Sequence, residues 1–267
     1  MPITVAIAGL GTIGRVLAQK LAQGMPGLAL ACAAAGHRKK AQAWLEASHI
    51  ACPVVEPGDF PAHADVAVEC APAAAFEHIC RPMLEAGKKV MVLSAGALLP
   101  RPDLVELAKL RGGQIIVPTG ALLGLDAVTA AAEGTIYSVR MISRKPPRGL
   151  AGAPYLEAHG ISVEDLSAPK RVFCGTAREG AAGFPANVNV AAALALAGIG
   201  PDRTLMEIWA DPSIDRNCHS IEIDSDSARF SLQIENIPSE NPRTGRITAL
   251  SVLAALRKLA GPLRVGT

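Results

Sequence analysis

The feature that most constrains the fold is a glycine pattern near the start of the chain, Gly9-Leu10-Gly11-Thr12-Ile13-Gly14. It follows an apolar run typical of a buried strand, residues 4–8, and precedes a helical pattern, residues 13–22. In such a unit the first glycine permits a tight turn, the second lets the backbone approach a pyrophosphate, and the third allows close packing. The N–H groups and the dipole of the helix N-terminus also favour an anion. The pattern predicts a dinucleotide site made by Gly9, Gly11, Thr12, Ile13 and Gly14, and a glycine-rich turn without a ligand is the alternative.

Strands and helices alternate through the first 117 residues. We expect strands at residues 4–8, 28–34, 66–69, 89–93 and 114–117, and helices at residues 13–22, 40–48, 74–86 and 104–111. Alternation at this spacing indicates a parallel sheet with crossover helices, and continuous apolar strands fit burial on both faces. The fold class is therefore α/β, with a Rossmann-type parallel sheet in a dinucleotide-binding domain that we place at residues 1–121.

Beyond residue 121 the pattern becomes mixed. We expect strands at residues 136–143, 172–175, 205–210, 220–223 and 228–236, and a helix at residues 186–197. These elements predict a second, mixed α/β domain at residues 122–245. Apolar residues at helical spacing over residues 246–259 predict a final helix, so we expect residues 246–267 to pack back on the first domain.

The composition excludes several functional classes. The chain has 26 Lys and Arg against 24 Asp and Glu, without basic blocks, so it offers no electrostatic footprint for nucleic acid and no polybasic membrane patch. Its longest apolar run, Val190 to Gly200, is shorter than the roughly 20 residues of a transmembrane helix. The 6 cysteines show no C-x-x-C spacing, so we expect free thiols and no metal site. With no signal-peptide pattern, we expect a cytoplasmic protein that binds neither nucleic acid nor membranes.

The residues after the second expected strand bear on the choice between NAD and NADP. A site selective for NAD usually has Asp or Glu there to bind the ribose hydroxyls. This chain instead has Ala35-Gly36-His37-Arg38-Lys39. Because Arg38 and Lys39 would attract a 2′-phosphate, we expect NAD or NADP to bind, with Arg38 in the cofactor site. The alternative is that both residues only begin the next helix in solvent.

Small residues follow other strands at the same edge of the sheet. They are Ala71 after the third strand, Ser94-Ala95-Gly96-Ala97 after the fourth and Thr119-Gly120-Ala121 after the fifth. Ligands of open α/β sheets lie at the carboxyl ends of the strands, so small residues there leave room for ribose and nicotinamide. Ala71 is accordingly a candidate cofactor contact, although small residues also fit ordinary loops.

Two segments of the second domain differ from plain core sequence. The first places Asn187 and Asn189 in the first turn of an apolar helix, where their amides can cap backbone N–H groups or hold a ligand amide. Capping suits Asn187 better, because Asn189 is expected inside the helix. The second segment ends with His219, just before an expected strand. A single histidine is more often structural than catalytic, so both interpretations of His219 stay open.

Seven motifs spread along the chain carry a family resemblance. GLGTIG, VECAP, KVMVLSAGALL, VPTGALLGLDAV, SRKPP, FPANVNVAAALALAGIGPDRT and ADPSIDRNCHSIEI occur in this order between about residues 3 and 255. Together they resemble NAD(P)-dependent L-aspartate dehydrogenases more closely than homoserine dehydrogenases or dihydrodipicolinate reductases. The resemblance implies a Rossmann domain, a catalytic and substrate domain that also serves dimerisation, and hence a homodimer.

The same resemblance implies an activity and its residues. The activity is oxidation of L-aspartate to iminoaspartate, which enters NAD biosynthesis or hydrolyses to oxaloacetate and ammonia, with reductive amination as the reverse. His219 is implied as the catalytic residue. Cofactor contacts are implied at Asn189 and at the backbone amide of Ala121, with acceptance of both NAD and NADP.

The residue types suit this chemistry. The amine of aspartate must lose a proton before its lone pair assists hydride departure, and a histidine is suited to take that proton. Asn189 offers the donor and the acceptor that a nicotinamide carboxamide needs. Arg144, Lys145 and Arg216 are candidates to bind the carboxylates of this small dicarboxylic amino acid, although each is equally a solvated surface charge. Another amino-acid or semialdehyde dehydrogenase, such as a homoserine dehydrogenase-like enzyme, and a non-catalytic NAD(P)-binding sensor are the alternatives.

Overall fold

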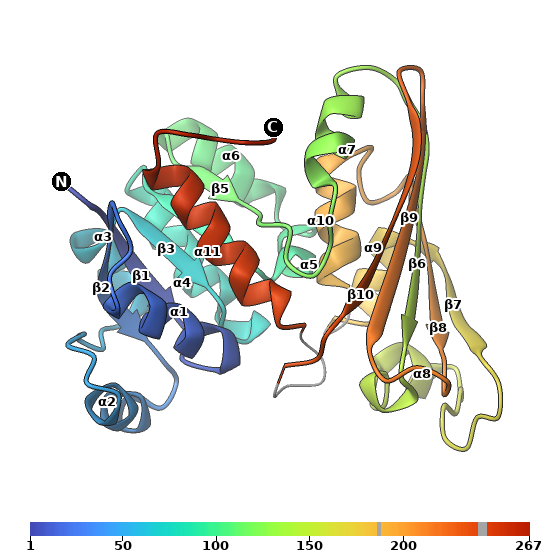
Figure 1. The fold of residues 1–267 in the computed structure, drawn as a ribbon, viewed down its shortest axis with the longest axis horizontal. Helices are drawn as coiled ribbons and strands as arrows, with labels where there is room; N and C mark the ends of the chain where they lie inside the picture. The colour runs from blue at the N-terminus through green and yellow to red at the C-terminus, as the bar shows by residue number, and fades with distance from the viewer. Residues whose placement is uncertain (186–187, 240–244) are drawn as a thin grey trace. The chain divides into compact units, whose positions relative to one another are not determined.

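The computed structural model describes residues 1–185, 188–239 and 245–267, which divide into two compact units (Figure 1). Unit 1 consists of Met1–Pro118 and Ala249–Val265. Unit 2 consists of Thr119–Thr248 with Gly266–Thr267. Unit 1 is therefore built from two separate stretches of the chain, and the residues of unit 2 lie between them in the sequence.

Unit 1 is organised around a five-stranded parallel sheet. In spatial order its strands are β2 (Leu28–Ala34), β1 (Ile3–Ala8), β3 (Val66–Glu69), β4 (Lys89–Val92) and β5 (Gln114–Ile116). Its helices are α1 (Thr12–Ala22), α2 (Arg38–Ala47), α3 (Phe60–His63), α4 (Phe76–Glu85), α5 (Ala95–Leu98), α6 (Pro102–Arg111) and most of α11 (Ile247–Ala260), with short 3-10 helices η1 (Pro57–Asp59) and η2 (Ala73–Ala75). Parallel strands joined through helices are typical of a Rossmann-type domain, so the expected α/β class is confirmed.

Two apolar cores cover the two faces of this sheet. Val5 and Ile7 of β1 join Leu17 of α1 in one core. Ala6, between them in the sequence, joins Met83 of α4 in the other core. Successive side chains of a strand point to opposite faces, so a strand buried on both sides must be apolar at nearly every position. The continuous apolar runs of the sequence have this origin.

The helix α11 belongs to the first of these cores. Its residues Val252 and Leu256 are fully buried in the same cluster as Val5 and Leu17. At Gly27, before β2, an added Cβ would lie 3.1 Å from Ala260, near the end of the helix. The last helix of the chain thus completes one face of the sheet to which the first strand of the chain, β1, belongs.

Unit 2 contains a five-stranded mixed sheet. In spatial order its strands are β10 (Arg229–Asn236), β9 (Asn217–Ser225), β6 (Ile136–Lys145), β8 (Thr204–Ala210) and β7 (Lys170–Thr176). β6 and β8 run parallel, and the other neighbours run antiparallel. The helices of unit 2 are α7 (Leu125–Ala132), α8 (Pro154–Ala158), α9 (Ala177–Gly183) and α10 (Asn189–Ala197), with the 3-10 helix η3 (Pro147–Gly149).

Helices cover one face of the second sheet, which we call the inner face. α9 packs against β7 and β8, and α10 packs against β8 and α7 (Figure 1). Along β6, the side chains of Met141, Ser143 and Lys145 are buried on the inner face. Arg140 and Arg144 alternate with them and are exposed on the opposite, outer face. Residues two apart in this part of the strand therefore share a face, so Ser143 and Lys145 lie together at the end of β6 and Arg144 lies on the opposite face.

Several elements differ from the expectations. α7 and α9 are not predicted by the periodicity, because short alanine- and glycine-rich helices carry few large apolar side chains. β9 begins at Asn217, so the expectation that His219 precedes the strand is wrong, and His219 is the third residue of β9. Its first three residues are polar or small, and pairing with β6 and β10 rather than apolar alternation makes them strand. Asn189 is the first residue of α10 rather than an interior one, and Asn187 lies outside the described residues.

No helix in the described part of the chain combines the length and the apolar character that crossing a membrane requires.

Candidate active site

The glycine pattern forms the loop between β1 and α1. Gly9 has a φ of +100°, and a Cβ there would lie 2.5 Å from the carbonyl oxygen of Cys70. A Cβ at Gly14 would lie 1.8 Å from the carbonyl oxygen of Gly9. The fold therefore needs glycine at both positions. At Gly11 an added Cβ would meet no atom within 4 Å, so the fold itself does not explain this glycine, whereas a ligand that approaches the backbone would.

The N-terminus of α1 follows this loop and is suited to an anion. Gly11 is the N-cap residue, no side chain caps the first turn, and that turn holds no acidic residue. The N–H groups of Thr12, Ile13 and Gly14 belong to the first turn, whose N–H groups have no acceptor within the helix. The loop and the helix end together fit the pyrophosphate of a dinucleotide.

A buried carboxylate connects two strand ends of the same sheet. Glu69 closes β3 and is 0% exposed. It accepts hydrogen bonds from the N–H groups of Leu93 and Ser94 and from the Ser94 hydroxyl, at distances between 2.9 and 3.2 Å. Burial raises the pKa of Glu69, although these hydrogen bonds act in the opposite direction. Sequence reasoning missed this residue, because a glutamate at the end of an apolar run gives no sign of being buried. Glu69 thus fixes the backbone that follows β4, at Leu93 and Ser94.

Arg38 lies four residues after the end of β2, where the sequence places it. It is the first residue of α2 and is exposed. The first turn of α2 holds no acidic residue, and His37 is its N-cap. The strand end thus carries positive charge and no carboxylate, which is the arrangement on which the expectation of NADP binding rests.

His219 lies on the inner face of the second sheet, opposite Ser143. The two residues are direct partners in the antiparallel pairing of β9 with β6. Ser143 Oγ and His219 Nδ1 are 2.9 Å apart, and the residues are 1% and 4% exposed. Burial, assisted by the charge of Lys145, lowers the pKa of His219 to about 3. The imidazole is therefore neutral at neutral pH and keeps one ring nitrogen as an acceptor.

The two cationic candidates on β6 lie on opposite faces of the sheet. Lys145 is on the inner face with His219, is 4% exposed, and burial lowers its pKa to about 8. Arg144 is on the outer face, where its guanidinium lies 3.2 Å from the Asp211 carboxylate and 5.5 Å from the ring centre of Trp209. Only Lys145 shares the surroundings of the histidine.

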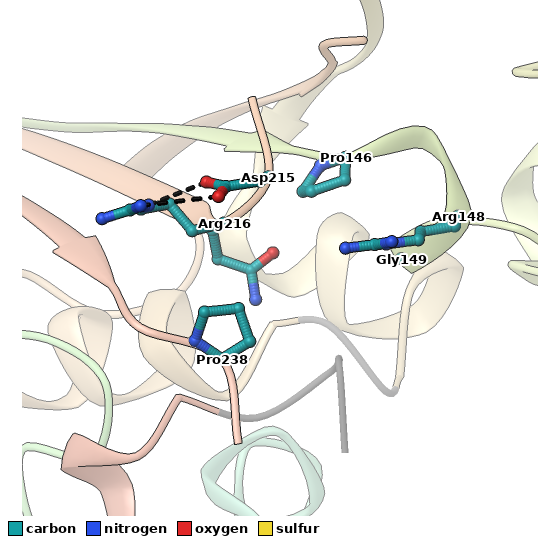
Figure 2. A pocket seen from close by; sticks show the side chains of 7 residues that line it. Pro146, Arg148, Gly149, Asp215, Arg216 and Pro238 are labelled. Atoms are coloured by element: carbon teal, nitrogen blue, oxygen red, sulfur yellow. Dashed lines mark hydrogen bonds and ion pairs between the residues drawn. The ribbon is translucent and has the colours of Figure 1, made fainter. Parts of the chain in front are cut away.

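A pocket lies at the end of the second sheet, beside these residues. It is lined by Pro146, Arg148, Gly149, Asp215, Arg216, Asn217 and Pro238 (Figure 2). Arg216 lies in it as a neighbour of Asp215, with 2.8 Å between Nε and a carboxylate oxygen. Pro146 follows Lys145 in the chain, and Asn217 precedes His219 by two residues on β9. Arg148, which sequence reasoning missed, comes from η3, an element too short to give a periodic signal.

The two remaining cofactor candidates belong to unit 2. Asn189 is half-buried at the start of α10. Ala121 precedes α7, and its carbonyl oxygen accepts a hydrogen bond of 3.0 Å from the Nδ2 of Asn236, a residue that is 2% exposed. Asn236 therefore fixes the backbone at Ala121, a role that its place at the end of a strand did not reveal in the sequence.

Two family models match the chain. A model described as "Aspartate dehydrogenase, C-terminal" matches residues 126–259, and one described as "Homoserine dehydrogenase, NAD binding domain" matches residues 9–118. Between them they contain the glycine pattern and the strand that carries His219. The first model alone matches half of the chain.

Curated relatives and a crystal structure agree with the first model. L-aspartate dehydrogenase 3 of Bordetella bronchiseptica is 54% identical over 264 residues, which is 98% of this chain and 97% of that protein. L-aspartate dehydrogenase of Bradyrhizobium diazoefficiens is 54% identical over 265 residues, 99% of this chain and 94% of that protein. The crystal structure of aspartate dehydrogenase from Thermotoga maritima has a TM-score of 0.80 and 25% identity, with 100% of both chains covered. On this similarity the chain belongs to the aspartate dehydrogenase family.

Proposed function

We propose that the chain catalyses the NAD(P)-dependent oxidation of L-aspartate to iminoaspartate and the reverse reductive amination. Iminoaspartate then enters NAD biosynthesis or hydrolyses to oxaloacetate and ammonia. The observation that carries the proposal is the buried pair of Ser143 and His219 beside a pocket with two arginines, in a chain of this family. A homoserine dehydrogenase-like activity is not favoured, because relatives that match nearly the whole chain are L-aspartate dehydrogenases.

Five residues of the glycine loop are assigned to the pyrophosphate: Gly9, Gly11, Thr12, Ile13 and Gly14. When bound, NAD or NADP supplies a nicotinamide ring that accepts a hydride. Ala71 leaves space after β3, and Arg38 attracts a 2′-phosphate. In unit 2, we assign Asn189 to the nicotinamide carboxamide, because its amide donates and accepts. Ala121 contributes its backbone N–H, with its carbonyl held by Asn236.

His219 is the proposed base. The ammonium of aspartate has to lose a proton before the nitrogen lone pair can assist departure of hydride from Cα. His219 is uncharged at neutral pH because it is buried, and it can accept that proton on the ring nitrogen that Ser143 does not contact. The carboxylates of a bound substrate raise the pKa of the imidazole, because a nearby negative charge favours its protonated form. Substrate binding thus makes the histidine a stronger base than it is in the free enzyme.

Lys145 is the proposed partner of the substrate's α-carboxylate. Lys145 is a cation on the same face as His219, and a pKa of about 8 leaves it mostly protonated at neutral pH. A carboxylate beside a buried ammonium offsets the cost of burying that charge. Arg144 is assigned instead to the outer face, where Asp211 binds it.

The test is a substrate screen that follows formation of reduced nicotinamide with the purified chain. L-aspartate should give a kcat/KM at least about a hundredfold above those of homoserine, aspartate semialdehyde and other amino acids. His219→Gln should lower kcat by at least about a hundredfold while the Kd for NADH stays within about threefold of the parent value. Turnover of aspartate by His219→Gln within about threefold of the parent would reject the catalytic assignment. Tight NADPH binding with no turnover of any amino acid would instead identify a sensor.

We also propose a cytoplasmic homodimer that associates through the outer face of the second sheet. Leu205 of β8, the register partner of the outer-face residue Arg140, is 53% exposed on this face. Light scattering should give the mass of two chains for the parent and of one chain for Leu205→Glu, because a buried, unpaired charge disfavours association. Leu110→Glu is the matched control, since Leu110 is an exposed leucine of unit 1. A parent of one chain, or a dimeric Leu205→Glu variant, would contradict this interface.

A further inference from the structure

The pocket at the end of the second sheet has an excess of positive charge. Among its lining residues, Arg148 and Arg216 are cations and Asp215 is the one anion. Arg216 is bound to Asp215, with nitrogen to oxygen distances of 2.8 and 3.5 Å. This pair leaves the charge of Arg148 without a matching anion in the pocket lining, which favours an anionic ligand.

Arg148 is available for such a ligand. Within residues 1–185, 188–239 and 245–267 its guanidinium makes no hydrogen bond and no ion pair. Its charge is felt at Asp215, whose pKa is lowered first by the hydrogen bond from Arg216 and also, to a smaller extent, by Arg148. Figure 2 shows the Arg148 side chain extending into the pocket, whereas the guanidinium of Arg216 turns to Asp215.

The backbone that carries Arg148 is held in place. Pro146 and Pro147 precede it, and each fixes its own φ. The N–H of Gly149 donates to the carbonyl of Pro146 at 2.9 Å, and the N–H of Leu150 donates to that of Pro147 at 3.0 Å. A site held this way loses little conformational freedom when a ligand binds, so the arginine is placed before the ligand arrives.

The pocket is close to the proposed base. Asn217 lines it and lies two residues before His219 on β9, which is about 6–7 Å along a strand and on the same face. Lys145 is the last residue of β6 and directly precedes the lining residue Pro146. A small amino acid with its amine at His219 and its α-carboxylate at Lys145 would extend its side chain towards Asn217 and Arg148.

We infer that Arg148 binds the side-chain carboxylate of the substrate and so selects a four-carbon dicarboxylic amino acid. The inference rests on the proposed function, because it takes His219 as the base. A guanidinium can hold a carboxylate through two parallel N–H bonds, and the Asn217 amide offers a further donor. The Asp215 carboxylate also lines the pocket and neutralises Arg216. The net charge of the pocket is therefore too small to bind every anion, and a ligand must also fit the donors of Arg148.

Binding to the NADH complex tests this inference without turnover, because reduced cofactor cannot accept a hydride. L-aspartate and L-asparagine differ only in the group that Arg148 would recognise, and calorimetry on the full-length chain gives both affinities. The parent should bind aspartate at least about tenfold more tightly than asparagine. Arg148→Ala should weaken aspartate binding at least about tenfold and change asparagine binding by less than about threefold. Arg148→Lys should lie between the two, because it keeps the charge without the paired donors.

Two control variants separate recognition from folding. Arg178→Ala removes an exposed arginine of the same unit that does not line the pocket, and it should bind both ligands as the parent does. Asp215→Asn adds positive charge to the pocket, so it should bind aspartate more tightly, by about two- to fivefold. A damaged fold would not produce that gain.

The inference is overturned if Arg148→Ala binds aspartate within about twofold of the parent, or if it loses aspartate and asparagine equally. Weaker aspartate binding by Asp215→Asn would also overturn it. Aspartate that binds through Arg148 but is not oxidised would remove the proposed function and leave the pocket assignment in place. Oxidation of aspartate that continues unchanged in Arg148→Ala would remove the pocket assignment and leave the proposed function in place.

Discussion

Ser143 and His219 face each other across β6 and β9, with 2.9 Å between the serine Oγ and the imidazole Nδ1. When Nδ1–H donates to the serine, Nε2 is left as an acceptor, which is the form that can take a proton from an ammonium. Ser143→Ala leaves a buried ring nitrogen without this partner. We expect kcat for aspartate oxidation to fall by about tenfold to a hundredfold with little change in KM.

The conservative variants keep this prediction specific. Ser143→Thr retains the hydroxyl and should recover most of the lost kcat. Ser220→Ala removes the hydroxyl next to His219 in sequence, on the outer face, and should behave as the parent. If Ser143→Ala keeps kcat within about twofold of the parent, or if the threonine variant is no better than alanine, the serine does not orient the histidine.

The lowered pKa of His219 makes the fold sensitive to acid. In an unfolded chain a histidine titrates near 6.5, whereas burial and the charge of Lys145 lower the pKa of His219 to about 3. Between these values the unfolded state binds the extra proton, so unfolding becomes easier as the pH falls through that window. His219→Gln cannot take up this proton. Between pH 7 and pH 4 it should lose less stability than the parent, by roughly 2–3 kcal/mol in urea denaturation. Equal losses would mean that His219 is not buried in a neutral form.

The glycines of the first loop should separate folding from cofactor binding. Gly14→Ala brings a methyl group within 1.8 Å of the Gly9 carbonyl oxygen, so we expect a loss of stability of about 2 kcal/mol or more. Gly11→Ala meets no atom within 4 Å, so it should lose only the roughly 0.5–1 kcal/mol by which alanine is a poorer N-cap than glycine. The same variant should weaken NADH binding by at least about tenfold, because its methyl group occupies the approach of the pyrophosphate. Fluorescence titration and thermal unfolding measure the two effects, and unchanged NADH affinity in Gly11→Ala would place the pyrophosphate elsewhere.

The preference between the two cofactors should depend on Arg38. Arg38→Ala removes a charge that can bind a 2′-phosphate, so the ratio of kcat/KM for NADP to that for NAD should fall by about tenfold. Lys40→Ala is the matched control, since Lys40 is an exposed lysine two residues further along α2. A ratio that is the same in the parent and in Arg38→Ala would show that this arginine only begins a solvated helix.

Local patterns predicted the parts of this protein that depend on neighbours in sequence. The strand over residues 28–34 and the strand over residues 66–69 are confirmed at both ends, because each is an apolar run bounded by polar or turn residues. The glycine loop is confirmed between β1 and α1 for the same reason. The assignments of Gly11, Asn189 and His219 to a cofactor or a reaction stay predictions.

Contacts between residues far apart in the sequence could not be predicted from these local patterns. Ser143 and His219 are 76 positions apart, and only the register of β9 on β6 makes them partners. The difference between Arg144 and Lys145 has the same origin, because neighbours on a strand point to opposite faces and the helices cover one of these faces. From charge alone, the sequence made both residues equal candidates to bind a substrate carboxylate. Arg148 could be identified as a candidate only from the structure, in which η3 and the start of β9 line one pocket.

The two-part construction of unit 1 has a consequence for synthesis on the ribosome. Residues 1–118 are made first, but the core on one face of their sheet also needs Val252 and Leu256, which follow about 130 residues later. At typical rates of elongation this delay lasts about 7–26 s. During that time the apolar surface around Leu17 is not yet covered by α11. The first domain to emerge is therefore the last to be completed, and its exposed surface has to be shielded from aggregation until α11 is made.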